Sequence, residues 1–293
     1  TTQYIMRFEP KAVMEAVDRT PAPPAPPPPA MLITMMEHPD FPKYDLSSLR
    51  ILVYTGSAIP ANVMKRAWKA FGPILCQSYG ATEGGGTMLL TEDHANALSD
   101  PSNEHILSSA GKPIVGCELK IVDDNDNEVP PGTMGEICFR SKAMIDRYWN
   151  KPEETAETFK GGWFHTGDMG RMDEEGYVYI MDRRKDIIVS GAENISAREV
   201  EDVIYSHPAV RECAVIGVPS DKWGEEVKAI VVPRQGMTIT PEEIIEYCRD
   251  KLAGYKRPKS AEIWQELPKN PAGKILKREV RERYWAGEKR RVH

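Results

Sequence analysis

The apolar positions change their spacing along the chain, and each spacing predicts a different element. Residues 8–19 have helical spacing, which predicts an amphipathic helix. Short apolar runs over 50–54 and 74–76 predict two strands, with helical periodicity over 61–71 between them. A polar, glycine-rich stretch over 77–86 follows and is interpreted as a loop. This order predicts a layered α/β domain that binds ligands at its strand ends.

The middle and the end of the chain have other patterns. Alternating runs over 118–122 and 135–140 are separated by turn-forming residues and predict a small antiparallel β-subdomain, and residues 176–181 predict a further strand. Ser196 and Thr240 each begin the spacing of a capping box, which predicts a helix after each. More strands are expected over 213–218, 226–232 and 261–264, and a last helix over 276–285.

These changes of pattern divide the chain into three regions. Residues 20–30 are almost entirely proline and alanine, and an extended linker is expected there because proline lacks the N–H that helix interiors and central strands need. We expect an N-terminal remnant over 1–39, a partial large domain with the β-subdomain over 40–182, and a small mobile α+β domain over 183–293. The charged stretch over 182–186 is interpreted as a hinge or as a salt-bridged surface turn.

Composition narrows the classes of function. The chain has 293 residues, of which 41% are hydrophobic and 28% charged, as in an ordinary soluble globular protein. The net charge of -6 argues against a nucleic-acid partner, and no apolar run is long enough to be a transmembrane segment. The five cysteines are scattered without metal-ligand spacing, which indicates reduced, mostly buried thiols in a cytoplasmic protein.

Two polar stretches have the chemistry to bind a nucleotide. Tyr79 offers a face for stacking on a base, Thr82 a hydroxyl for a phosphate oxygen, and Glu83 a carboxylate for Mg²⁺. By composition alone, a polar turn with a packed tyrosine is favoured there. Asp168 could accept from ribose hydroxyls, although an aspartate after a glycine is usually a turn residue. His165 alone is more typical of a packed or surface histidine than of a general base.

The loop over residues 268–274 presents lysines before a helix. It is not a P-loop, because the upstream glycine is absent and Ile275 stands where Ser or Thr is needed. A solvated loop is one interpretation. The other is a mobile loop that brings Lys274 to a developing negative charge.

Four motifs in a fixed order make the chain similar to a known family. They are Tyr79-Gly-Ala-Thr-Glu83, Trp163-Phe-His-Thr-Gly-Asp168, Asp182-Arg-x-Lys-Asp186 with Gly191-x-x-Asn194, and residues 268–274. Together they resemble the adenylate-forming (AMP-binding) superfamily, and within it the acyl-CoA synthetases and fatty-acid–CoA ligases. The resemblance covers nearly everything from residue 40 onward. It implies an α/β fold: the C-terminal part of the large adenylate-forming domain, followed by a small mobile domain.

The resemblance implies an ATP-dependent ligase that activates a fatty or aryl carboxylic acid as an acyl-adenylate and passes it to coenzyme A. Lys274 would bridge the acid and the α-phosphate, Thr82 would bind phosphate and Glu83 would hold Mg²⁺. Lys185 matches the hinge position. The other implied contacts are Gly56, Ser57, Ala58 and Tyr79 at the adenine, Asp168 and Arg183 at the ribose, Gly191 at the pantetheine of coenzyme A, and glycines 84–86 beside the acyl group.

One family feature is missing from this sequence, namely the Ser/Thr/Gly-rich loop ending in lysine that wraps the β- and γ-phosphates. We therefore expect an incomplete chain with little or no ligase activity by itself. Two alternatives stay open: an adenylation domain that loads a carrier protein, and an inactive fragment that binds AMP or a protein partner. The sequence leaves the identity of the acid and the formation of a homodimer open.

Overall fold

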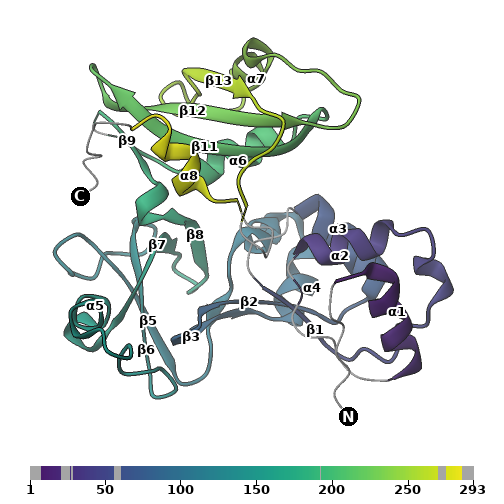
Figure 1. Cartoon of the computed structure of the whole chain (residues 1–293). Helices are drawn as coiled ribbons and strands as arrows, with labels where there is room; N and C mark the ends of the chain where they lie inside the picture. Colours follow the sequence, from purple (N-terminus) through teal and green to yellow (C-terminus); the bar gives the residue numbers. More distant parts are fainter. Residues whose placement is uncertain are drawn as a thin grey trace. The chain divides into compact units, whose positions relative to one another are not determined.

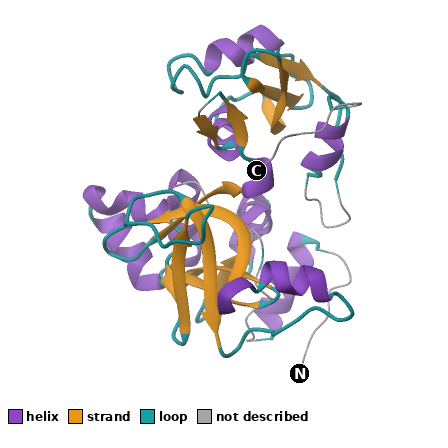
Figure 2. Ribbon diagram, turned by 90° about the vertical axis from the view of Figure 1, so that its left-hand side faces the viewer, coloured by secondary structure: helices purple, strands orange, loops and turns teal. Residues whose placement is uncertain are grey.

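The computed structural model of the chain describes residues 8–20, 27, 29–55, 61–191, 193–269 and 275–285 (Figure 1). The chain divides into two compact units: unit 1 comprises Thr1–Thr166 and Gly170–Ile180, and unit 2 comprises Gly167–Met169 and Met181–His293. Each unit combines helices with a mixed sheet, so the predicted α/β class is confirmed (Figure 2). The assignment of these units to a large and a small mobile domain stays a prediction.

Helices form the beginning of unit 1. α1 (Pro10–Arg19) confirms the first predicted helix, and the carboxylate of Glu9 accepts hydrogen bonds from two backbone N–H groups of its first turn, at 3.2 and 2.6 Å. α2 (Pro29–Glu37) shows that the predicted linker over 20–30 was too long. Proline can occupy the first turn of a helix, because the backbone N–H groups there have no partner within the helix and a missing one costs nothing. Residues 21–26 and 28 lie outside the described residues.

The first sheet of unit 1 has the strand order β1-β2-β3-β4. β1 and β2 are parallel and are joined through α3, and β3 and β4 are added antiparallel. The elements are β1 (Leu52–Thr55), α3 (Ala61–Phe71), β2 (Leu75–Ala81), β3 (Gly84–Leu89), α4 (Thr91–Ser99), a 3₁₀-helix (Pro101–Ser108) and β4 (Lys112–Pro113). In Figure 1, α1, α2 and α3 lie together beside β1. The two helical segments after β3 were not predicted from the sequence.

The stretch over 77–86 was predicted as a loop, and this prediction is wrong. β2 continues to Ala81 and β3 begins at Gly84, so that only Thr82 and Glu83 form the turn of a hairpin. A glycine-rich polar sequence is typical of loops. However, the ladder of backbone hydrogen bonds between adjacent strands does not need apolar side chains, and it decides the conformation here.

The second sheet confirms the predicted β-subdomain. Its strand order is β5-β6-β7-β8, with β5 and β6 antiparallel. The elements are β5 (Cys117–Val122), β6 (Gly135–Ser141), α5 (Pro152–Thr158), β7 (Phe164–Met172) and β8 (Val178–Arg183). β7 was missed because its glycines suggest a turn. Gly170 has a packing reason instead, since a Cβ there would lie 2.6 Å from the carbonyl oxygen of Tyr179.

Unit 2 is built on one sheet with the order β10-β9-β12-β11 and with β13 beside β12. The elements are β9 (Ile188–Ser190), β10 (Glu193–Ile195), α6 (Ala197–Tyr205), β11 (Val210–Ser220), β12 (Gly224–Pro233), α7 (Pro241–Tyr247), β13 (Ser260–Ile263) and α8 (Lys277–Glu282). α6 and α7 belong to a core that includes Val215 and Val231, whereas α8 belongs to a second core that includes Ile216 and Ile230. Because neighbouring residues of a strand point to opposite faces, β11 and β12 are covered on both sides.

The two predicted helix starts are present in unit 2. Thr240 and Glu243 make both hydrogen bonds of a capping box, as predicted. Ser196 accepts a hydrogen bond from the N–H of Glu199 at 3.2 Å, but the carboxylate of Glu199 binds Lys256 at 2.7 Å. An ion pair therefore replaces the second half of the predicted box at α6.

Two general expectations can be compared with the described residues. All five cysteines are free and buried, which confirms the prediction of buried thiols. No helix in the described ranges is both long and apolar enough to cross a membrane.

Candidate functional site

The hairpin between β2 and β3 carries three of the predicted site residues. Tyr79 is half-buried in β2, and its ring centroid lies 5.8 Å from that of Phe139. Thr82 is exposed and Glu83 is half-buried, and the two form the turn. One short hairpin therefore presents an aromatic ring, a hydroxyl and a carboxylate from unit 1.

The carboxylate of Glu83 is held by a tyrosine that sequence reasoning missed. The hydroxyl of Tyr148 donates to Oε1 of Glu83 at 2.7 Å. Burial, and after it the hydrogen bond to Glu83, raises the pKa of Tyr148 to about 12, so this phenol stays protonated and donates at neutral pH. The N–H of Ile145 also donates to the carbonyl oxygen of Glu83 at 2.9 Å. The bond from Tyr148 orients the carboxylate, and the bond from Ile145 fixes the backbone of Glu83. A carboxylate is the kind of ligand that Mg²⁺ prefers.

The glycines after Glu83 allow close contact between backbones. A Cβ on Gly86 would lie 2.2 Å from the carbonyl oxygen of Tyr79, and one on Gly84 would lie 2.9 Å from Cα of Met144. Gly86 also has a φ of +148°. The packing of the hairpin itself thus requires glycine at these positions. This requirement differs from the prediction that glycines 84–86 leave space for an acyl group.

A second group of predicted residues lies in unit 2. Nε of Arg183 is 3.1 Å from Oδ1 of the buried Asp168. A hollow of about 260 Å³ beside this pair is lined by Gly167, Arg183, Arg184 and Lys185. Three cationic side chains line this hollow, and one of them holds a buried carboxylate; together they suit a ligand that carries both hydroxyl and phosphate groups.

The predicted hinge segment is tied to the rest of unit 2 on either side of Lys185. Lys185 itself is exposed, in a 3₁₀ turn (Arg184–Asp186). The buried Asp182 accepts hydrogen bonds from Oγ of Ser196 at 3.3 Å and from the N–H of Arg198 at 3.0 Å, both at the start of α6. Asp186 binds Nη2 of Arg281 in α8 at 2.6 Å. The segment therefore connects to two helices.

Gly191 occupies the turn between β9 and β10. Its φ is +65°, and its N–H donates to the carbonyl oxygen of Trp223 at 2.7 Å. A Cβ there would lie 3.2 Å from the Trp223 ring. The glycine is required by both its conformation and its neighbour.

Four predicted site residues lie outside the described residues: Gly56, Ser57, Ala58 and Lys274. The two ends of the loop that carries Lys274 are described. Lys269 and Ile275 form an antiparallel bridge, and the N–H of Leu276 donates to the carbonyl oxygen of Pro268 at 2.8 Å. These contacts close the base of the loop directly before α8.

A buried ion pair anchors α8 three residues after Lys274. Nζ of Lys277 lies 2.8 Å from Glu201 of α6, whose Oε1 also accepts from the N–H of Val215 at 2.7 Å. Burial raises the pKa of Glu201 to about 6, against the opposing charge of Lys277. Burial alone would lower the pKa of Lys277, but the negative charges of Glu201 and Asp182 outweigh burial and raise it.

The sequence contains only a weak signal for these anchoring residues. Glu201 follows Ala197 and precedes Ile204 on the helical repeat of α6, so it falls on the buried side of that helix. A carboxylate at such a position needs a cation, which directs attention to a distant basic residue. Nothing in the pattern identifies Lys277 or Arg281 as that residue.

Comparisons with known families agree with the motifs. The family model for "AMP-binding enzyme" matches residues 2–149, and the model for "AMP-binding enzyme C-terminal domain" matches residues 199–274. These two ranges contain the β2–β3 hairpin and most of unit 2.

Individual relatives extend this similarity. A feruloyl-CoA synthase from Amycolatopsis sp is 40% identical over 278 residues, covering 94% of this chain and 55% of the relative. The fatty acid–[acyl-carrier-protein] ligase ScoC from Streptomyces coeruleorubidus is 38% identical over 264 residues, covering 90% of this chain and 50% of the relative. The solved structure of the amide bond synthetase McbA from Marinactinospora thermotolerans has a TM-score of 0.84 at 38% identity, covering 96% of this chain and 56% of its own. The chain spans about half the length of these relatives.

Proposed function

Because the chain belongs to the AMP-binding enzymes of the adenylate-forming superfamily, we propose that it is part of an ATP-dependent acyl-CoA ligase. In the first step a carboxylate oxygen of the acid attacks the α-phosphate of ATP, and pyrophosphate leaves. In the second step the thiol of coenzyme A attacks the acyl carbon, a thioester forms and AMP leaves. The substrate class we propose is a fatty or aryl carboxylic acid.

The observation that carries this proposal is the Asp168–Arg183 pair at a hollow lined by cations. A buried carboxylate can accept from both ribose hydroxyls, and a guanidinium beside it holds that carboxylate in place. Lys185, exposed at the same hollow, is the proposed hinge residue. Gly191 is proposed to contact the pantetheine, for which its open backbone is suited.

The β2–β3 hairpin supports the roles proposed in unit 1. Tyr79 is proposed to stack on the adenine, together with Gly56, Ser57 and Ala58. Thr82, exposed at the turn, is proposed to donate to a phosphate oxygen. The oriented carboxylate of Glu83 fits Mg²⁺, and the ion would neutralise phosphate charge when it is bound.

Lys274 is proposed as the catalytic cation of the first step. Negative charge grows on the α-phosphate in the transition state, so a lysine there stabilises the transition state more than the ground state. The closed base of its loop and the anchored α8 are the described features that support this proposal.

The proposal includes that the chain is incomplete, since it spans about half of its relatives and its sequence lacks the Ser/Thr/Gly-rich phosphate loop. The chain by itself would then be inactive, or would bind AMP alone. The cytoplasmic location and the homodimer stay predictions. One relative favours a second candidate function: the similarity to a fatty acid–[acyl-carrier-protein] ligase makes a carrier protein an alternative acceptor in the second step.

The test combines the intact mass of the purified protein with acid-dependent pyrophosphate release over a panel of fatty and aryl acids. A mass above that of the 293 residues, with turnover that is lost in Lys274→Ala, is the result expected of a working ligase.

AMP binding to the chain itself is measured by calorimetry, where Asp168→Asn is expected to weaken binding about tenfold by loss of a charged hydrogen bond. Unchanged AMP binding in Asp168→Asn would contradict the proposed ribose contact. A comparison of coenzyme A with a carrier protein as acceptor decides between the two second steps.

A further inference from the structure

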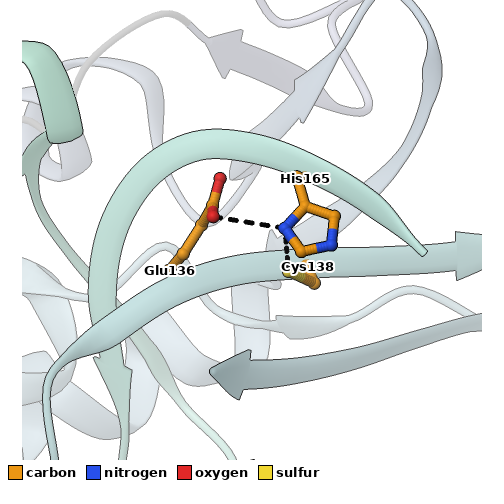
Figure 3. Close-up of side chains that lie close together, drawn as sticks. All are labelled: Glu136, Cys138 and His165. Carbon is orange, nitrogen blue, oxygen red and sulfur yellow. Dashed lines mark hydrogen bonds and ion pairs between the residues drawn. The ribbon is translucent and has the colours of Figure 1, made fainter. Parts of the chain in front are cut away.

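Two buried side chains and one partly exposed side chain that the proposed ligase does not use lie together in the second sheet of unit 1. Glu136 and Cys138 are two residues apart on β6 and therefore point to the same face, and His165 lies on the neighbouring strand β7. Figure 3 shows the imidazole facing both the carboxylate and the thiol. The hydroxyl of Thr166 donates to the carbonyl oxygen of Ile137 at 2.7 Å, which fixes β7 beside β6 at this point.

Two of the three distances within this group are close to those between the ligands of a tetrahedral metal ion. Nδ1 of His165 is 3.2 Å from Oε2 of Glu136 and 3.5 Å from Sγ of Cys138. The three donor atoms all lie within 4.8 Å of one another. Zinc bonds of about 2.0–2.3 Å in tetrahedral directions place ligand atoms roughly 3.3–3.7 Å apart. An ion therefore fits between these side chains after small rotamer adjustments.

One imidazole nitrogen of this group has two neighbours that compete for it. One ring nitrogen, Nδ1 of His165, faces both a carboxylate and a thiol. With a proton it can donate to Glu136, and without one it can accept from Cys138, but it cannot do both. A divalent cation at the centre interacts favourably with all three donors at once.

Burial and donor type select the kind of ion. Cys138 is 0% exposed and Glu136 7%, and the His165 side chain is 12% exposed. Imidazole with thiolate suits zinc and other transition metals, whereas Mg²⁺ and Ca²⁺ take oxygen ligands. The partial exposure of His165 leaves a path for a water molecule as fourth ligand.

We propose that Glu136, Cys138 and His165 bind one Zn²⁺ ion per chain, with water as the fourth ligand. The ion cross-links β6 and β7. Binding breaks the S–H bond of Cys138, forms a zinc–sulfur bond and releases the proton to solvent.

The charges around the group are compatible with this site. Burial, and after it the charge of Glu136, raises the pKa of Cys138 to about 12, so the thiol keeps its proton until a cation is bound. Lys120 lies opposite Cys138 in the β5–β6 register, but its ammonium is placed over the ring of Trp163, 4.7 Å from the centroid. This nearby cation is thus engaged by an aromatic face.

The test titrates tag-free, chelator-treated protein with Co²⁺ and then with Zn²⁺. One Co²⁺ per chain is expected, with the sulfur-to-cobalt charge-transfer absorption and the intense visible bands of a tetrahedral ion, and Zn²⁺ is expected to displace it. Cys138→Ser should abolish the charge-transfer absorption, and His165→Gln should weaken zinc binding at least about tenfold. Cys117→Ser is the matched control, because this buried cysteine lies on the neighbouring strand β5 outside the group.

The outcomes separate the alternatives. Loss in Cys138→Ser and His165→Gln with retention in Cys117→Ser supports the site. The proposal is overturned if the wild-type chain gives no charge-transfer band, or if all three variants bind as the wild type does. Circular dichroism of each variant checks folding. If Cys138→Ser does not fold, the zinc affinity of the more exposed His165→Gln decides.

Discussion

The two regions that carry the proposed catalytic residues are held in place by different forces. The β2–β3 hairpin of unit 1, with Thr82 and Glu83, is fixed by backbone contacts that leave no room for a Cβ on Gly86. The base of the Lys274 loop in unit 2 is followed by a helix that two ion pairs hold, Lys277–Glu201 and Arg281–Asp186.

This difference has a consequence for how each region can be disturbed. Backbone packing responds to added volume and is insensitive to charge. A buried ion pair responds to the loss of either partner and to protonation. The hairpin should therefore depend on shape and α8 on charge, a difference that substitutions and pH can test.

The largest effect is expected from Lys277→Met. The substitution leaves Glu201 without its cation in a buried position, which should destabilise unit 2 by about 3–5 kcal/mol. Urea unfolding measures the change. Arg278→Met on the same helix is the control, because its pair with Glu282 is exposed and contributes little. Equal losses in the two variants would show that α8 does not depend on the buried charge.

Gly86→Ala should have the next largest effect. A Cβ would meet the carbonyl oxygen of Tyr79 at 2.2 Å, so the hairpin must open, at a cost of about 2–4 kcal/mol. The matched control is Gly132→Ala, a glycine with positive φ whose Cβ would meet nothing within 4 Å. Thermal unfolding of both variants measures the difference. A control as unstable as Gly86→Ala would mean that backbone conformation, rather than packing, explains the requirement.

A smaller effect is expected from pH at the buried Glu201 of unit 2. Because burial raises the pKa of Glu201 from 4.5 to about 6, the folded chain binds a proton more tightly than the unfolded chain does. This contribution to stability is fully present below pH 4.5 and is lost as the pH rises through about 6. Wild type should therefore gain up to about 2 kcal/mol between pH 7 and pH 4.5 relative to Glu201→Gln. Identical pH profiles of the two proteins would contradict the assignment.

Tyr148→Phe should have the smallest effect on stability. It removes the hydrogen bond from the phenol to Glu83, which is worth about 1 kcal/mol at this partly exposed position. If Glu83 holds Mg²⁺ as proposed, the complete enzyme carrying Tyr148→Phe should also need more Mg²⁺ for pyrophosphate release. An unchanged Mg²⁺ requirement would show that Tyr148 does not contribute to metal binding and has a structural role only.

Much of the fold could be predicted from the sequence, and the failures have physical causes. The helix over Ala61–Phe71 and the strands around 213–218 and 226–232 follow from periodicity, because each buries a regular set of apolar residues. β3 and β7 were missed because their glycines are typical of turns, whereas in the fold they are required by close contacts with other strands, which no local pattern shows.

The candidate site divides in the same way. Tyr79, Asp168 and Lys274 could be named as candidates because they belong to motifs. Their supporting residues could not, because Tyr148 reaches Glu83 across 65 positions of the chain, and Lys277 reaches Glu201 across 76. Such pairs depend on the tertiary fold and have no spacing of their own.

Because all five cysteines are buried, the reactivity of their thiols can be used to measure local opening of the structure. Cys76, Cys117 and Cys138 belong to unit 1, and Cys213 and Cys248 to unit 2. Since a buried thiol reacts with an alkylating reagent only after its surroundings open, labelling followed by peptide mass spectrometry records the opening of each unit separately. The native sequence thus provides intrinsic probes for comparing the opening of the unit that carries the β2–β3 hairpin with that of the unit that carries α8.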